Sequence, residues 1–428
     1  MFKTLQNAWK IPELRRKILF TIFIVIIYRF GAIIPVPFIN SADMMTALKS
    51  QTDGSIFQYL DILSGSAFSR ATLFALSISP YITASIVIQL LTVAIPALER
   101  LSKNGEEGKK KLTQITRIVT VVLGLVTSFG YYMYMRNLGV LTDNSVFCAV
   151  VIIACYSAGT ALVMWLAEKI NESGIGNGIS IILFANILSN GISIVGTAIN
   201  YIKQGPWGLV LVEGLAIISL AIITFVVFVT ESERRLPVQY AKKVVGRKMY
   251  GGQNTNLPIK LNMSGVMPII FANSIVALPA TLALIFPTDG HKIWGAIVNF
   301  LSYGSWFYVI VFVILIVAFS YFYISISFNP IEVSNNLKKN GGFIPGIRPG
   351  KPTADYISRV LGRITLIGAF FLCIVAALPL IANIVSGNKL QGIAFGGSSL
   401  LIVVGVALET ARELEGQMTM RHYKGFLE

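Results

Sequence analysis

The stretch DILSGSAFSRATLFALSISPYITASIVIQLL, residues 61–91, indicates how this chain is built. Its second part is apolar enough to cross a bilayer, whereas its first ten residues contain Asp61, Gly65, Arg70 and three serines. With the apolar residues before it, the stretch is longer than the roughly 20 residues that one helical crossing needs. We therefore interpret it as two pieces, a separate half-helix over 56–72 and a membrane span that follows it.

Apolar residues dominate the whole chain. Of 428 residues, 54% are hydrophobic and 13% are charged, and the mean hydropathy is +0.71. A soluble domain has about 25% charged residues. We predict an all-α polytopic membrane protein, because a transmembrane β-barrel would show short segments of alternating hydrophobicity instead.

Ten membrane spans are predicted from the apolar runs. They lie near residues 18–36, 73–95, 115–134, 147–167, 178–200, 208–230, 267–287, 305–328, 361–384 and 397–411. Residues 1–17 mix Phe2 and Trp9 with Lys3 and Lys10 at roughly helical spacing, which is typical of an amphipathic helix on the membrane surface. A frayed terminus is the alternative.

The basic residues predict the orientation. With the N-terminus in the cytoplasm, the cytoplasmic segments hold 28 of the 35 Lys and Arg residues and the opposite segments hold five, while Arg29 and Arg70 lie within apolar segments. Cytoplasmic loops carry the excess of Lys and Arg in membrane proteins. We therefore expect both termini in the cytoplasm, an even number of spans and attraction to anionic lipids.

Two cytoplasmic segments, 231–266 and 329–363, are far longer than a connection between spans requires. Together they hold 13 of the 35 basic residues. We interpret them as a docking surface for a large acidic partner, with a plain solvated linker as the alternative.

The ten spans divide into two sets of five, which gives the domains 18–200 and 201–411, followed by a tail over 412–428. Halves with an odd number of spans enter the membrane from opposite sides, as in inverted-topology repeats. The second span of each half is interrupted, by Gly65 and Pro80 in the first and by Pro268 and Pro279 in the second. Matching broken spans point to a path between the halves, although proline also simply bends membrane helices.

The residues that we expect to line this path are aliphatic. A secondary transporter with inverted repeats, the alternative function, needs ionisable groups near the midplane. Here Arg29, Arg70, Glu213 and Glu409 fall near span ends or in the broken segment. Ile82 and Ile86 lie one turn apart with Gln89 on the same face. Such residues can form a constriction that excludes hydrated ions, or they can be ordinary core packing.

No motif for a cofactor, a metal or catalysis is present. The three cysteines, Cys148, Cys155 and Cys373, lie in apolar runs without paired spacing, and the two histidines are far apart. We expect no disulfide, no metal site and no enzymatic activity.

Several longer patterns resemble the SecY/Sec61-alpha family, the channel subunit of the protein translocase. The clearest is NPIEVSNNLKKNGGFIPGIRPGKPTADYISRVLGRIT at 329–365. Others are SISPYITASIVIQLL (77–91), NGEEGKKKLTQITR (104–117), GIGNGISIILFANI (174–187), ESERRLPVQYAKK (231–243) and GGSSLLIVVGVALE (396–409). The resemblance covers essentially the whole chain.

This resemblance implies a clamshell of two pseudo-symmetric five-helix halves around an hourglass-shaped pore in the bacterial cytoplasmic (inner) membrane. Such channels pass unfolded secretory chains and open sideways, between the second and third and the seventh and eighth helices, to release membrane segments into lipid. The expected partners are the SecE and SecG subunits, the SecA ATPase or a ribosome, signal peptides and nascent chains.

The resemblance also assigns roles to residues. The pore ring matches Ile82, Ile86, Leu183, Ile187, Ile270 and Ile402. The plug matches 59–72, including Tyr59, Asp61, Ser64, Gly65, Ser66, Ala67, Arg70 and Thr72. The lateral gate matches Thr83, Thr127, Asn273 and Ser274. Partner docking matches Arg247, Lys248 and Arg348, and Glu409 stands where the family usually has Asp.

The plug match explains the polar start of the opening stretch. A segment in a water-filled funnel need not be uniformly apolar. Small residues at 64–67 would let it pack closely beneath the ring and slide away. We therefore expect weak packing, because a stopper must leave at a modest cost in free energy.

Overall fold

The computed structural model describes residues 2–51, 61, 64–203, 205–240, 243–245, 248–250, 254–283, 292–300, 305–385 and 397–424. The helices are α1 (Phe2–Lys10), α2 (Pro12–Gly31), α3 (Ser41–Gln51), α5 (Ser79–Ala94), α6 (Pro96–Lys103), α7 (Gly105–Asn137), α8 (Val146–Ser173), α9 (Gly178–Lys203), α10 (Pro206–Glu231), α11 (Met267–Ala283), α12 (Lys292–Phe300), α13 (Trp306–Ser327), α14 (Pro330–Lys339), α15 (Lys351–Val385) and α16 (Gly397–Lys424). The strands are β1 (Glu233–Tyr240), β2 (Lys243–Val245), β3 (Lys248–Tyr250), β4 (Asn254–Lys260) and β5 (Gly342–Phe343).

Each of the ten predicted spans falls on a helix: α2, α5, α7, α8, α9, α10, α11, α13, α15 and α16. Within the described residues, five helical stretches are long and apolar enough to cross a membrane. They are Gly105–Asn137, Val146–Ser173, Val212–Glu231, Trp306–Lys339 and Lys351–Ala382, with a sixth if α5 and α6 count as one bent span. A mostly helical protein with several apolar spans is thus confirmed, although strands β1–β5 show that it is not all-α, while the count of ten and the division into halves stay predictions.

The half-helix predicted over 56–72 is wrong for its second part. Residues 65–78 form a series of turns, and α5 begins only at Ser79, six residues later than the predicted span. Gly65, Ser66, Ala71 and Ser77 have positive φ angles of 50–68°, which a right-handed helix excludes. The helix then starts with a proline in its first turn, a position that proline favours.

The span after these turns is also interrupted at its other end. Ile95 is extended, as expected of a residue before proline, and α6 leaves α5 at 102°. Farther on, side chains cap new helices. Ser145 accepts a hydrogen bond from the Cys148 N–H at the start of α8, and Asn329 accepts one from the Ile331 N–H at the start of α14.

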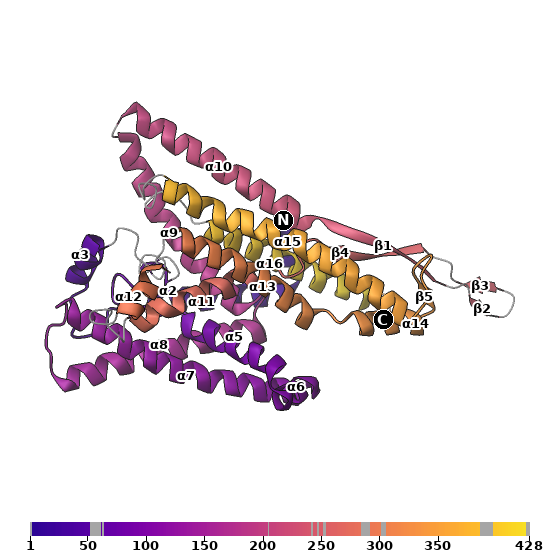
Figure 1. Ribbon diagram of the computed structural model, residues 1–428, viewed down its shortest axis with the longest axis horizontal. Coiled ribbons are helices and arrows are strands. Elements are labelled where there is room, and N and C mark those ends of the chain that lie inside the picture. Colours follow the sequence, from indigo (N-terminus) through magenta and orange to yellow (C-terminus); the bar gives the residue numbers. More distant parts are fainter. Residues whose placement is uncertain are drawn as a thin grey trace.

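The long helices give the molecule two distinct ends, while its orientation in the membrane stays a prediction. In Figure 1 the long helices run along its length, with α14 and strands β1 and β4 toward one end, α3 at the opposite end and α6 near the middle. Two of the segments predicted to face the cytoplasm, 231–266 and 329–363, lie together at the end that holds the strands.

The two long segments are not linkers but parts of one small sheet. Strand β1 pairs antiparallel with β4, from Glu233 opposite Lys260 to Gln239 opposite Asn254, and its far end pairs with β5. Leu236, Ile259 and Ile357 are among the buried residues that give this sheet its own hydrophobic cluster against α15. The segment predicted over 329–363 ends earlier than expected, because α15 starts at Lys351 and continues into the predicted span.

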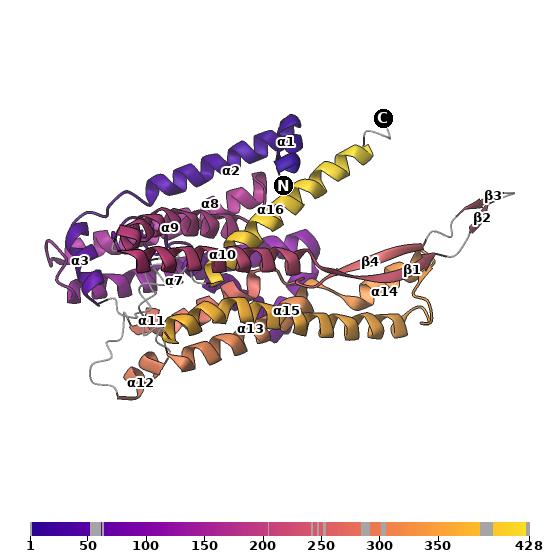
Figure 2. The ribbon, with the colours of Figure 1, turned by 90° about the horizontal axis from the view of Figure 1, so that it is seen from above.

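The N-terminal segment forms two helices rather than one. Pro12 begins α2 after an extended Ile11. Ala8 and Leu14 pack with Ile175 and Leu414, which joins α1 to α16, as Figure 2 shows. A helix over the first residues is therefore confirmed, while its position on the membrane surface stays a prediction.

Candidate functional site

The six residues predicted to form a ring lie on four helices and in one buried cluster. They are Ile82 and Ile86 on α5, Leu183 and Ile187 on α9, Ile270 on α11, and Ile402 on α16. None is more than 4% exposed. The residues next to two of them, Val87 and Leu188, are 38% and 56% exposed. The six side chains therefore face the interior of the helix bundle and not the outer surface.

A small polar junction lies beside this aliphatic cluster. Asn186 on α9 donates to the Tyr28 hydroxyl of α2 at 2.9 Å and to the Ser77 hydroxyl at 3.1 Å. The Tyr28 ring stacks on Phe74 at 5.3 Å. The turns before α5 are thereby joined to α2 and α9.

The segment predicted to be the plug lies against this junction. Tyr59 is outside the described residues. Ser64, Ala67 and Thr72 are buried, Arg70 is exposed, and the remaining described residues of the prediction, Asp61, Gly65 and Ser66, are half-buried. The Asp61 carboxylate accepts a hydrogen bond from the Ser69 N–H at 2.8 Å. The expectation of weak packing is thus wrong for the described part of this segment.

Three of the four predicted gate residues line one cavity. Thr83 on α5, Thr127 on α7 and Ser274 on α11 border a cavity of about 70 Å³ between these helices. Their hydroxyls donate to carbonyls of their own helices, those of Ser79, Leu123 and Ile270. Each hydroxyl donates its hydrogen bond within its own helix, so these bonds do not join α5, α7 and α11 to one another.

Asn273, the fourth predicted gate residue, is buried on α11 and is not among the residues that line the cavity. Its Nδ2 has no hydrogen-bond partner among the described residues. A buried amide without a partner costs free energy in the folded protein. The Asn273 side chain therefore lowers the stability of the packing around α11.

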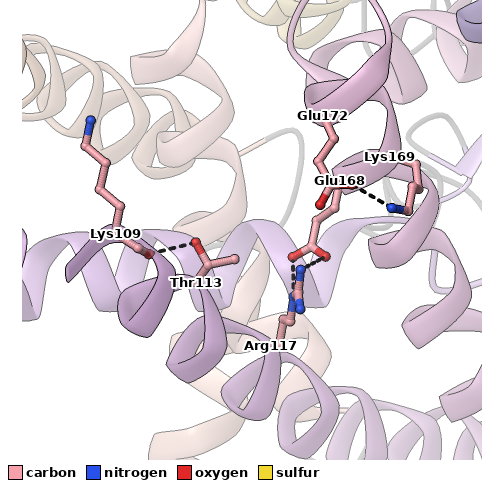
Figure 3. A network of polar contacts seen from close by, with 6 residues as sticks. All are labelled: Lys109, Thr113, Arg117, Glu168, Lys169 and Glu172. Carbon is pink, nitrogen blue, oxygen red and sulfur yellow. Dashed lines mark hydrogen bonds and ion pairs between the residues drawn. The ribbon is translucent and has the colours of Figure 1, made fainter. Parts of the chain in front are cut away.

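Helix α7, which carries the predicted gate residue Thr127, is joined to α8 by an ion pair. Arg117 Nε lies 2.9 Å from Glu168 Oε1, and Nη2 lies 2.7 Å from Oε2. Figure 3 shows the two side chains facing each other, with the exposed pair Lys169–Glu172 beside them. The Glu168 side chain is 9% exposed and that of Arg117 is 45% exposed. This bidentate pair did not enter the sequence predictions.

The predicted docking residues lie at the end of the molecule that holds the sheet. Arg348 is exposed on the loop between β5 and α15. Lys248 belongs to the hairpin of β2 and β3, and Arg247 lies outside the described residues. The structure thus brings Arg348 to a surface loop of the sheet that both long segments build.

A large groove that the sequence did not predict runs between α2, α9 and α16. Its volume is about 1,090 Å³ and its lining is almost wholly apolar, with Val25, Phe184 and Val406 among the contributors. Arg29 lies at this groove, where its Nη2 donates to the Ala185 carbonyl at 3.0 Å. The groove is wide enough for an additional apolar element, and only the folded chain brings its three walls together.

Glu409 lies at a further cavity of about 170 Å³ near the sheet, whose lining mixes charged and apolar residues. Arg412 crosses this region and donates to the Thr230 carbonyl at 2.7 Å. Burial lowers the pKa of the Lys260 ammonium, and Arg412 acts in the same direction. The charge at Glu409 therefore has basic neighbours here.

Comparisons with known proteins agree with this geometry. The family model SecY matches residues 72–411. Protein translocase subunit SecY of Streptomyces galbus is 41% identical over 448 residues, and that of Mycobacterium tuberculosis is 42% identical over 446 residues, with 100% of each chain covered. The chain belongs to the SecY family.

Solved SecY-type structures share the fold. One is a SecY whose plug domain stabilises the closed state of the translocation channel, with a TM-score of 0.68, 19% identity and 97% of both chains covered. Another is Sec61 in the canine ribosome–channel complex from the endoplasmic reticulum, with a TM-score of 0.61, 18% identity and 97% of both chains covered. The family resemblance read from the sequence is thereby confirmed.

Proposed function

We propose that this SecY-family chain is a protein-conducting channel that moves unfolded secretory chains across the bacterial cytoplasmic membrane and releases membrane segments sideways into lipid. SecY and Sec61 relatives are protein-conducting channels. In this proposal ten spans form two inverted halves, 18–200 and 201–411, and both termini lie in the cytoplasm. In this proposal the protein conducts polypeptide chains and catalyses no reaction.

The observation that carries the proposal is the buried aliphatic cluster drawn from both halves. Ile82 and Leu183 belong to the first half, and Ile270 and Ile402 to the second. An apolar constriction excludes hydrated ions because they do not shed their water to enter it. Aliphatic side chains also form no hydrogen bonds with a passing backbone, so they close around any sequence without retaining it.

The cavity between α5, α7 and α11 supports a lateral gate at this place. Hydrogen bonds of Thr83, Thr127 and Ser274 stay within their own helices. Two faces in such contact separate without loss of these bonds. A signal peptide that enters there exchanges water for lipid, at roughly −0.3 to −0.6 kcal/mol for each apolar residue at the helix centre.

The surfaces suggest where the partners bind. The groove between α2, α9 and α16 suits a single apolar helix, and we assign it to SecE, which would then contact both halves. The sheet and the loop around Arg348 would bind SecA or a ribosome; relatives have been seen on ribosomes. We also retain SecG and anionic lipids as partners.

Crosslinking tests the proposal directly. A hydrophilic secretory chain is stalled in transit through channels in which Cys148, Cys155 and Cys373 have been replaced by alanine. Single cysteines at positions 82, 187, 270 and 402 should crosslink to the stalled chain. Cysteines at 87 and 188, whose side chains are exposed on the outside of the same helices, are the matched controls. Crosslinks from the controls but not from the four inner positions would refute the proposed path.

A further inference from the structure

The loop between α8 and α9, residues 174–178, is fixed to the predicted first half of the chain. The Ile175 N–H donates to the Thr21 hydroxyl of α2 at 3.1 Å. The Gly178 N–H, at the start of α9, donates to Asn171 Oδ1 of α8 at 2.7 Å. Side chains of α2 and α8 thus hold the loop backbone from two sides, and the loop moves with these helices.

The same loop lies against α16, which belongs to the predicted second half. At Gly176, with φ 80°, an added Cβ would lie 3.2 Å from the Thr410 hydroxyl oxygen of α16. Ile175 is buried and packs in one cluster with Leu414 of α16 and Leu14 of α2. The two halves therefore touch here through a glycine backbone and through buried apolar side chains.

Helix α16 makes these contacts with a single face. Thr410, Leu414 and Gln417 follow one another at intervals of four and three residues, which places them side by side on a helix. Lys17 Nζ of α2 donates to Gln417 Oε1 at 3.2 Å, and the buried Ala8 of α1 belongs to the apolar cluster. We call the following residues the α16 junction: Ala8, Leu14, Lys17, Ile175, Gly176, Thr410, Leu414 and Gln417.

The contact between the halves along α11 is of a different kind. There Thr83, Thr127 and Ser274 border a cavity of about 70 Å³, and their hydroxyls bond within their own helices. The α16 junction instead has a side-chain hydrogen bond between the halves and a close backbone approach at Gly176. Separating closely packed surfaces forfeits their dispersion contacts. The halves therefore part more readily along α11 than at the α16 junction.

The chain itself joins the two halves at the other end of α9. This helix starts at Gly178, next to the loop, and ends at Lys203, and α10 begins at Pro206. At 1.5 Å per residue, the 26 residues of α9 span about 39 Å. The covalent connection and the α16 junction thus lie at opposite ends of one helix. Two fixed points define an axis of rotation, whereas one point alone leaves its direction open.

We propose that the α16 junction is a second pivot, which keeps these ends of the two halves together while the halves rotate about α9 and part along α11. This inference rests on the proposed channel function and adds to it the axis of opening. Rotation changes distances near its axis least and distances far from it most. A bridge across the junction is therefore compatible with transport, whereas a bridge across the α5–α11 contact is not.

Chemical linkage tests the pivot. Lys17→Cys and Gln417→Cys are joined by bis-maleimidoethane in a channel whose three native cysteines are replaced by alanine, reconstituted in vesicles with its partner subunits. We expect export of a secretory chain to continue at close to the rate of the unlinked channel. Thr83→Cys and Ser274→Cys, joined in the same way, are the matched comparison and should abolish export. Mass spectrometry of the joined peptides gives the linked fraction in each case.

A second measurement does not depend on transport. Spin labels on Arg16→Cys and Thr419→Cys, both at exposed positions, report the distance across the junction by pulsed electron spin resonance. Ile175→Ala combined with Leu414→Ala should broaden the resting distance distribution, because it leaves a void in the buried cluster. Leu19→Ala, at an exposed position of α2, is the control and should leave the distribution narrow.

Two results would overturn the inference. One is a linked junction that stops export as completely as the linked α5–α11 pair does. The other is a double alanine variant whose distance distribution is as narrow as that of the Leu19→Ala control. Export by the unlinked channel tests the channel function separately. Because the distances are compared in resting protein, failure of one proposal is distinguishable from failure of the other.

Discussion

Thr353 holds Arg348 in place: its hydroxyl donates to the Arg348 carbonyl at 2.8 Å. The next turn of the same loop is fastened from α14, where the Ser334 hydroxyl donates to the Gly350 carbonyl at 2.7 Å. Both serine and threonine are buried, while the Arg348 side chain is exposed. A fixed backbone with a free guanidinium is suited to bidentate pairing with a carboxylate or phosphate of a partner.

Arg348→Glu should therefore reduce partner-driven export at least tenfold without reducing the amount of folded channel. The reversal replaces attraction by repulsion at one point of the docking surface and leaves the loop backbone held by Thr353. Export of a secretory protein into vesicles, driven by SecA and ATP, is the measurement. Lys351→Glu makes the same change in charge three residues away and serves as the control. Equal losses in the two variants would show that overall charge matters and not Arg348 itself.

Ile82→Ser combined with Ile270→Ser should increase the leakage of ions through resting channels. Hydroxyl groups at two points of the buried cluster let water enter a constriction that aliphatic side chains keep dry. Single-channel conductance of purified channels in planar bilayers measures the leak. Val87→Ser, on the exposed side of α5, should leave the channel as tight as the parent. A double variant as tight as this control would remove the ring from the mechanism.

Asn273→Leu should stabilise the closed gate and raise the hydrophobicity that a signal peptide needs. Burying an amide group without a partner costs about 1–3 kcal/mol, and leucine removes that cost. At roughly 0.5 kcal/mol per apolar residue, the threshold should rise by about two to six apolar substitutions. Export assays with a graded series of signal peptides measure it. Ser274→Ala is the control, because the Ser274 hydroxyl bonds only within its own helix at 2.9 Å; an unmoved threshold in Asn273→Leu would contradict the role.

The helices, and the buried face that Ile82 and Ile86 share, could be predicted because they follow from local chemistry. An apolar run near 20 residues has few alternatives to a helix, and the helical spacing of Ile82 and Ile86 gives their common face. Family motifs supplied the rest of the ring. The turns over 65–78 could not be found in this way, because they depend on carbonyls bound by Tyr131 and Tyr156, which lie 63 and 85 residues away in sequence.

The sheet and the groove were missed for the same physical reason. Strand β5 has two residues and is stable only because it pairs with β1, about a hundred residues earlier. The groove is a relationship among α2, α9 and α16, so no single stretch contains a sign of it. The bidentate pair of Arg117 and Glu168 is likewise formed by two helices whose charged residues look, in sequence, like ordinary span ends.

Arg117→Ala should destabilise the channel more than Glu168→Gln does. Loss of the arginine leaves a carboxylate that is 9% exposed without its partner, whereas loss of the carboxylate leaves an arginine that is 45% exposed and can still reach water. Breaking a fully buried pair costs about 3–5 kcal/mol, and the partial exposure of Arg117 reduces this to about 2 kcal/mol. The apparent melting temperatures of the two purified variants in detergent would show which one is less stable.

The double variant Arg117→Ala with Glu168→Ala should melt above Arg117→Ala alone, because it removes the unpaired buried charge as well. Lys169→Ala, which breaks the exposed neighbouring pair with Glu172, should melt close to the parent, since exposed pairs contribute little. If Arg117→Ala and Lys169→Ala had the same melting temperature, the Arg117–Glu168 pair would contribute no more to stability than an exposed ion pair. The expected order would show that the pair fixes α7 to α8, so that under the proposed function the two helices would move together when the lateral gate opens.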